Sequence, residues 1–239
     1  MNALADLLPD LRAKGVELWT EGDRLRFRAP PGALSPEAKQ LLRSRRDEVI
    51  ATLRREAGST RVEGPMAANQ EGLWVIQQVA PDSPAYNIAF AARVRGAIDP
   101  EAMEEAFQVL VDRHEALRTC YKVGPSEQPK REVVGYVPVH LDVVDAEDSS
   151  PDQVRAAVAE AYSRPFRLDS APLLRGHLVR RGPQRSVLLL NAHHMAVDGQ
   201  SLFVLIGELF AVYQALVDGT AIPPRHDGAD FGDFVAWQS

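Results

Sequence analysis

Residues 186–199 read SVLLLNAHHMAVDG, an apolar run that ends in two adjacent histidines and is followed by Asp198 and Gly199. The apolar run predicts a buried strand, and residues 200–217 predict a helix whose apolar stripe belongs to the core. A near-neutral base, a carboxylate and a glycine therefore come together at a strand-to-helix corner. Rigid flanks fix side-chain directions at such a corner, which favours proton-transfer chemistry there.

Alternation along the predicted strand separates the two histidines. Successive side chains of a strand point to opposite faces, so only one of His193 and His194 can face a given cavity. Chelation needs convergent ligands, so no metal site is expected from this pair. Asp198 could orient a histidine or pair with a buried cation, and Gly199 permits close backbone approach. The alternative is that both histidines are structural, but the whole HHxxxDG pattern between strand and helix favours a function.

At these residues the chain resembles a known family. HHMAVDG at 193–199 matches the HHxxxDG motif of condensation domains in nonribosomal peptide synthetases, whose superfamily includes chloramphenicol acetyltransferase. Further stretches that match this family are RHEALRT at 113–119, PFRL at 165–168 with PLLR at 172–175, and NQEGLW at 69–74, which departs from the family pattern at Asn69 and Gly72. The matches occur in family order from about residue 65 onward. The resemblance implies one chloramphenicol-acetyltransferase-like α/β lobe.

The resemblance also implies an enzyme that forms an amide. Two carrier proteins bring the substrates on 4′-phosphopantetheine arms, the acceptor amine attacks the donor thioester, and no cofactor is bound directly. His194 matches the family's catalytic position, as a general base or as the group that positions the amine. The backbone N–H of Gly199 is the candidate oxyanion donor. His193 is implied to be a packed structural partner, and Asp198 to be architectural and tied to an arginine. In this sequence, Arg175 is one arginine that could pair with Asp198.

A small, polar stretch at residues 58–64 predicts a linker between a first domain at 1–57 and a second domain at 65–239. Leucines at helical spacing predict a helix that ends near residue 15. Residues 16–20 and 24–29 predict two short strands around a tight turn. Ser35 and Pro36 then open a helix with a break near Ser44. The first domain is therefore predicted to be a small α-β-β-α unit.

Three arginines, Arg24, Arg26 and Arg28, alternate with apolar residues in the second of these strands. If the strand lies at an edge, its free backbone groups could pair with an added peptide strand, and the arginines would select an acidic partner. The alternative is that these charges only protect the edge from aggregation.

Residues 1–57 resemble the TubC-type N-terminal docking domains of hybrid synthetases. The stretches that carry the resemblance are GVELW at 15–19, GDRLRFRAP at 22–30 and GALSP at 32–36. The resemblance implies that the hairpin receives the acidic C-terminal tail of the upstream synthetase subunit, with Arg24, Arg26 and Arg28 as contacts. Trp19 either adds an apolar pocket to this surface or belongs to the core.

The bulk composition is that of an ordinary globular protein, with 239 residues of which 45% are hydrophobic and 25% are charged. The net charge is −6 and no polybasic tail is present, so nucleic acid is not an expected partner. The single cysteine, Cys120, excludes an intrachain disulfide and fits a cytoplasmic location. We expect no apolar stretch of membrane-spanning length, and therefore no membrane partner.

Condensation domains have two similar lobes with a tunnel between them, and the HHxxxDG motif belongs to the first lobe. Residues 231–239 read FGDFVAWQS and resemble the linker that leaves this lobe. We therefore expect the C-terminal lobe to be absent and the chain to be inactive by itself. Two other functions stay open: a free-standing acyltransferase that uses acyl-CoA, and a module that serves protein interaction alone.

Overall fold

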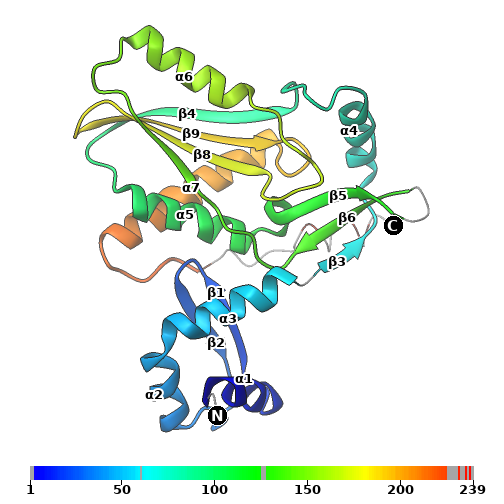
Figure 1. Cartoon of the computed structure of the whole chain (residues 1–239), viewed down its shortest axis with the longest axis vertical. Helices are drawn as coiled ribbons and strands as arrows, with labels where there is room; N and C mark the ends of the chain where they lie inside the picture. The colour runs from blue at the N-terminus through cyan, green and yellow to red at the C-terminus, as the bar shows by residue number, and fades with distance from the viewer. Residues whose placement is uncertain are drawn as a thin grey trace.

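The computed structural model describes residues 3–59, 61–124 and 128–224, together with Phe231, Val235 and Trp237. The N-terminal part is a small unit of helices and one β-hairpin, and the rest is a mixed α/β lobe (Figure 1). The predicted class, an α-β-β-α unit followed by one α/β lobe, is confirmed, with one helix more in the first unit. The chain end at 231–239, which resembles an interlobe linker, lies mostly outside the described residues.

Five elements form the first unit: α1 (Ala3–Ala13), β1 (Glu17–Glu21), β2 (Arg24–Arg28), α2 (Pro36–Ser44) and α3 (Arg46–Ser59). Ser35 caps α2, because its hydroxyl accepts a hydrogen bond from the N–H of Ala38 over 3.2 Å. The expected helix break near Ser44 is confirmed, since α2 ends at that residue. The core of the unit gathers buried apolar side chains from these elements and their loops: Leu8, Leu11, Val16, Leu34, Leu42, Val49 and Leu53.

The stretch at residues 58–64, which the sequence predicts to be a linker, contains regular secondary structure. Helix α3 continues to Ser59, and residues Arg61–Gly64 form strand β3, which pairs antiparallel with β6 (Pro129–Val134). The polar composition conceals this strand, because backbone hydrogen bonds to β6 hold it and its Val62 side chain is exposed. The connection between the two units therefore belongs to a sheet of the lobe, and the exact domain boundary stays a prediction.

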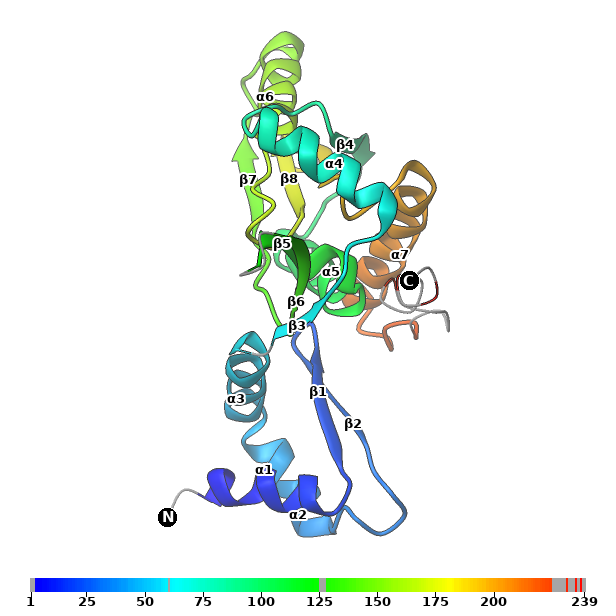
Figure 2. The ribbon, with the colours of Figure 1, turned by 90° about the vertical axis from the view of Figure 1, so that its right-hand side faces the viewer.

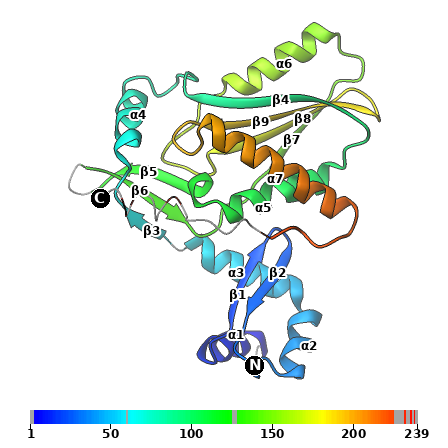
Figure 3. The same ribbon diagram turned by 180° about the vertical axis from the view of Figure 1, so that it is seen from behind.

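The main sheet of the lobe has four strands in the order β4 (Asn87–Arg95), β9 (Arg185–His193), β8 (Leu174–Arg180) and β7 (Leu141–Asp145). The pair β7–β8 is parallel and the other pairs are antiparallel. Helix α6 (Pro151–Ser163) covers one face, and α5 (Pro100–Arg113) and α7 (Gly199–Val217) cover the other (Figure 1, Figure 3). Because both faces are covered, β9 reads as a continuous apolar run.

The main core lies between this sheet and helices α5 and α7. Its fully buried side chains include Phe107 and Leu110 of α5, Leu190 of β9 and Leu209 of α7. Strand β8 approaches α5 very closely at Gly176, where an added Cβ would lie 2.7 Å from the Phe107 ring. This close packing fixes the sheet against α5, and with it the end of β9.

A second sheet has three strands in the order β3-β6-β5, with β5 (Thr119–Val123) following a short 3₁₀ turn at Glu115–Arg118. Helix α4 (Ala68–Val79) begins shortly after β3 (Figure 2). One apolar cluster joins α4, β5 and the loop after β9: Met66, Leu73, Trp74, Tyr121, Phe166, Leu168, Leu173 and Met195. The HHxxxDG loop is therefore packed from two sides.

Helix α7 is long and apolar enough to cross a membrane, with 19 residues and a mean hydropathy of 1.6. The expectation that no apolar stretch reaches this length is therefore wrong. Length and composition alone are weak evidence, because the core helix of a globular fold has the same properties. Leu202, Leu205 and Leu209 are buried in the main core, whereas Phe203 is exposed. The absence of a membrane partner stays a prediction.

Candidate functional site

The HHMAVDG stretch forms the corner between β9 and α7. Strand β9 ends at His193, residues 194–196 turn, and Asp198 caps the helix that begins at Gly199. The backbone N–H of His194 donates to the carbonyl of Tyr86 over 2.9 Å. The corner is thus fixed to a segment more than one hundred residues earlier in the chain.

The two histidine rings lie in opposite environments, as the strand alternation predicts. His194 is exposed, whereas His193 is 1% exposed and its ring lies 6.1 Å from the Phe166 ring and 6.4 Å from the Tyr86 ring, centroid to centroid. Burial lowers the pKa of His193 to about 4, so this ring is neutral at pH 7. The exposed ring of His194 is therefore the one that a substrate can reach.

Gln70 and Tyr121 hold the loop that follows the histidines. The buried Gln70 side chain donates to the carbonyl of Met195 over 2.9 Å and to the Tyr121 hydroxyl over 2.8 Å. The Tyr121 hydroxyl in turn donates to the same Met195 carbonyl over 3.2 Å. Burial raises the pKa of Tyr121, so the phenol keeps its proton and remains a donor. Sequence reasoning gave Gln70 no role, although it stands in the NQEGLW stretch.

Asp198 is a helix cap. Its carboxylate accepts from the N–H of Ser201 over 2.7 Å, and this hydrogen bond lowers the pKa of Asp198. Asp198 does not pair with Arg175, although the sequence left this pairing possible. Arg175 donates to the carbonyl of Pro165 over 2.9 Å, and its guanidinium lies 4.0 Å from the centroid of the Phe166 ring. Arg175 therefore fixes the segment of Pro165 and Phe166 that packs against His193. Asp198 instead stabilises the first turn of α7.

The first turn of α7 is open beside Gly199. A Cβ at this position would meet no atom within 4 Å in the described structure, so the backbone can be approached closely on this side. The first N–H groups of a helix have no partner inside the helix and carry a partial positive charge. This N–H can therefore donate to an oxygen that becomes negative. No group of three or more His, Cys, Asp or Glu side chains that could hold a metal lies among residues 3–59, 61–124 and 128–224.

The hairpin carries its charges on one face. The register pairs Glu17 with Arg28, Trp19 with Arg26 and Glu21 with Arg24, so these six residues share one side.

Each of the three arginines has a partner within the chain. Arg26 forms an ion pair with Glu21 at 2.7 Å, Arg28 lies 3.6 Å from Glu17, and Arg24 donates to the carbonyl of Thr220 over 3.4 Å. Arg26 and Arg28 are thus paired with carboxylates, whereas Arg24 donates to a backbone carbonyl, which does not neutralise its charge. Trp19 is 43% exposed, so it does not belong to the core.

A groove of about 310 Å³ lies between β2 and α2. Apolar side chains of Leu25, Phe27 and Leu34 line it, together with the cations Lys39 and Arg43. Phe27 is 55% exposed. Lys39 and Arg43 form no ion pair within the described part of the chain. The groove therefore combines an apolar floor with uncompensated positive charge beside the strand.

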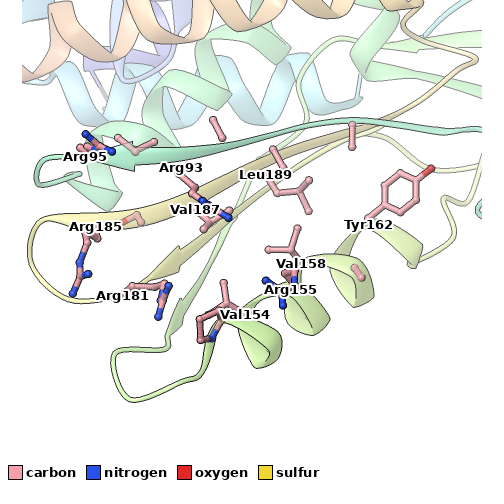
Figure 4. Close-up of a pocket in the computed structure, with 17 residues that line it drawn as sticks. Arg93, Arg95, Val154, Arg155, Val158, Tyr162, Arg181, Arg185, Val187 and Leu189 are labelled. Carbon is pink, nitrogen blue, oxygen red and sulfur yellow. The ribbon is translucent and has the colours of Figure 1, made fainter.

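A larger cavity of about 770 Å³ lies between α6 and the strands β4 and β9 (Figure 4). Figure 4 shows arginines at one end of this cavity and Tyr162 near the other. His194 does not line it. This cavity is therefore separate from the corner that holds the histidine motif.

Family comparisons cover almost the whole chain. The condensation domain family matches residues 61–239, and the TubC N-terminal docking domain family matches residues 4–55. A linear gramicidin synthase polypeptide of Brevibacillus parabrevis is 36% identical over 178 residues, which is 73% of this chain and 2% of that protein. Bacitracin synthase 2 of Bacillus licheniformis is 24% identical over 249 residues, 99% of this chain and 9% of that protein.

Solved structures agree with this assignment. The starter condensation domain of rhizomide synthetase superposes with a TM-score of 0.66 at 26% identity, over 74% of this chain and 43% of that one. The first condensation domain of the calcium-dependent antibiotic synthetase gives a TM-score of 0.68 at 25% identity, with the same coverage of 74% and 43%. The chain thus spans less than half of these solved chains. It belongs to the condensation domain family of nonribosomal peptide synthetases and opens with a TubC-type N-terminal docking domain.

Proposed function

We propose that this chain joins an upstream synthetase subunit to the first half of a condensation site. In this proposal the complete site forms an amide between a donor thioester and an acceptor amine, both carried on 4′-phosphopantetheine arms of carrier proteins. The observation that carries this proposal is the contrast between the two histidines at the corner of β9 and α7. His194 is exposed in the turn that follows β9, and its neighbour His193 is buried and neutral.

The proposed reaction assigns a role to each group at the corner. The amine nitrogen attacks the thioester carbon, the C–N bond forms, the C–S bond breaks, and the thiol leaves with a proton. His194 accepts the proton that the amine loses, or holds the amine in line for attack. A general base contributes about two to four decades in rate, and positioning alone can supply several kcal/mol. The Gly199 N–H donates to the oxyanion of the tetrahedral intermediate.

The chain alone is proposed to be inactive, because it spans 43% of the solved condensation domains that it matches. The test is a peptide-forming assay with loaded donor and acceptor carrier proteins. We expect no product above background from residues 1–239 and turnover from the complete domain that contains them. Robust turnover by the 239-residue chain would overturn this part. Binding of free CoA by the lobe, without any carrier protein, would instead favour an acyl-CoA-dependent acyltransferase.

For docking, we propose that an acidic C-terminal tail of the upstream subunit adds as a strand to the free edge of β2. An added strand gains backbone hydrogen bonds and places alternate side chains on either face. Apolar side chains of the tail would then enter the groove beside Phe27, and its carboxylates would meet Lys39 and Arg43. Arg26 and Arg28 would contribute from the other face, in competition with Glu21 and Glu17.

A peptide titration tests this docking mode. Acidic C-terminal tail peptides are titrated at low salt into the wild type, Arg26→Glu, and the double variant Lys39→Glu with Arg43→Glu. Arg55→Glu is the matched control, because Arg55 is exposed on α3 and does not line the groove. We expect the double variant to lose most of the affinity and the control to keep it. Equal affinity of all variants would overturn the proposed surface, and a complete domain that binds tails but never supports turnover would be an interaction module alone.

A further inference from the structure

The tip of the docking hairpin lies directly on helix α5 of the lobe. The N–H of Gly22 donates to the Asp112 carboxylate over 3.0 Å, and the N–H of Asp23 donates to Glu105 over 3.4 Å. Gly22 has a φ of +54°, and a Cβ there would lie 2.8 Å from a methyl group of Val109. The turn therefore fits against the helix only because it carries a glycine.

A buried ion network continues from this contact into α7. Arg113 of α5 forms ion pairs with Glu21 of the hairpin at 2.7 Å and with Glu208 of α7 at 2.6 Å. The Arg113 side chain is 4% exposed, and those of Glu21 and Glu208 are 14% and 13% exposed. Removing the charge of Glu21 would take one of two carboxylates away from a buried guanidinium, which costs more than losing a pair on the surface.

Two further bonds fix the lobe side of this network. Arg113 also donates to the carbonyl of Pro223 over 2.6 Å, and His114 lies 2.6 Å from the second oxygen of Glu208. Burial alone would raise the pKa of Glu208, but hydrogen bonds from His114 and Arg113 bring it down to about 2. Glu208 is therefore ionised at neutral pH, and it holds Arg113 from the lobe side together with the carbonyl of Pro223.

A second contact lies along helix α3. Arg54 donates to the carbonyl of Gly22 over 2.7 Å, and its guanidinium lies 5.2 Å from the centroid of the Tyr136 ring in the lobe. At Gly135 an added Cβ would lie 2.5 Å from the carbonyl oxygen of Ala57. The docking unit thus contacts the lobe through its hairpin tip and through its last helix.

We propose that these contacts seat the docking domain in one fixed orientation on the lobe, with Arg113 as the positioning residue of the seat. Strand β2 pairs only with β1 among the described strands, so its outer edge stays available while the tip is seated. If the proposed tail docking is correct, a bound tail is then held at a fixed place relative to the corner of α7. The seat itself does not depend on the docking proposal.

Amide hydrogen exchange on the full chain tests the seat, with Gly22 as the reporter. Its N–H is protected by a lobe carboxylate and not by the hairpin ladder. Glu21→Gln removes the charge that faces Arg113. Glu17→Gln is the matched control, because Glu17 lies on the same strand and the same face but is 66% exposed. We expect Gly22 to exchange about tenfold faster or more in Glu21→Gln and at the wild-type rate in Glu17→Gln. An unchanged rate in Glu21→Gln would overturn the proposal.

Orientation is tested by the distance between spin labels at Gln40→Cys in the docking domain and Ala156→Cys in α6. Both positions are exposed, and the native Cys120 is buried. One narrow distance distribution is expected in the wild type and in Glu17→Gln, and a broadened one in Glu21→Gln. A broad distribution in the wild type would show a freely tethered domain and overturn the seat. Failure of tail peptides to bind, with a narrow distribution retained, would refute only the docking proposal.

Discussion

The backbone N–H of Met195 donates to Nδ1 of His193 over 3.1 Å, so the buried ring carries its proton on Nε2. The pKa of His193 falls from an ordinary 6.5 to about 4 on folding, mainly because the ring is buried. As the pH drops below 6.5, the His193 ring becomes protonated in the unfolded chain but stays neutral in the folded chain. Stability from this group is thus complete above pH 6.5 and is lost progressively toward pH 4.

We expect the free energy of unfolding to fall by about 3 kcal/mol from this group alone between pH 7 and pH 4. Urea unfolding across this range measures it. His193→Asn is the control, because an amide oxygen can still accept from Met195 but does not titrate. The pH dependence of wild type should exceed that of His193→Asn. Parallel curves for the two proteins would show that His193 is not held neutral.

Replacing His194 should affect chemistry and leave the fold intact. The ring is exposed, so His194→Ala should change the free energy of unfolding by less than about 0.5 kcal/mol. In the complete condensation domain, amide formation should fall by about two to four decades. His140→Ala is the matched control, since His140 is also exposed and lies outside the motif. A His194→Ala domain with wild-type rates would refute the catalytic assignment.

Asp198 should matter as a helix cap and not as the partner of Arg175. Asp198→Ala should lower the free energy of unfolding by about 1 kcal/mol, whereas Asp198→Asn keeps an acceptor for Ser201 and should cost less. In a double-mutant cycle with Arg175→Lys, the two effects should add, because Arg175 is bound to Pro165 and Phe166. A coupling energy well above about 0.5 kcal/mol would instead indicate an ion pair between the two residues.

Gln70 should link the stability of the motif loop to activity. Gln70→Ala leaves a buried carbonyl and a buried hydroxyl short of a donor, which should cost about 1–3 kcal/mol in unfolding free energy. We expect the rate of amide formation in the complete domain to fall as well, because Met195 follows His194. Gln77→Ala is the control: Gln77 is also buried, but it donates to Pro81 at the other end of α4. Equal losses of rate in both variants would point to general destabilisation.

Local patterns predicted the parts of this fold that depend on neighbours in sequence. The apolar run before His193, the helix after Gly199 and the opposite environments of the two histidines follow from the periods of strand and helix. The cap at Ser35 and the break near Ser44 are local in the same sense. These features require no knowledge of what lies across the sheet.

Features that depend on distant segments were missed or misassigned. Strand β3 is polar, and it forms because its backbone pairs with β6. The composition of residues 61–64 does not indicate this pairing. Arg175 lies on β8, where the carbonyl of Pro165 and the Phe166 ring are closer than Asp198. The roles of Gln70 and Glu21 depend on contacts with residues more than fifty positions away. A cross-strand pairing rule could have found the Arg26–Glu21 pair, since both residues flank one short turn.

Strand β3 limits where a docking unit can be cut from the lobe when synthetase modules are recombined. If the docking unit were cut off after Gly64, β6 would lose one of its two neighbours, and its unpaired edge could then associate with other strands. A fusion junction at Thr60 leaves Arg61–Gly64 with the downstream partner. A chimera with its junction at this position keeps the complete sheet of β3, β6 and β5, whichever docking unit precedes it.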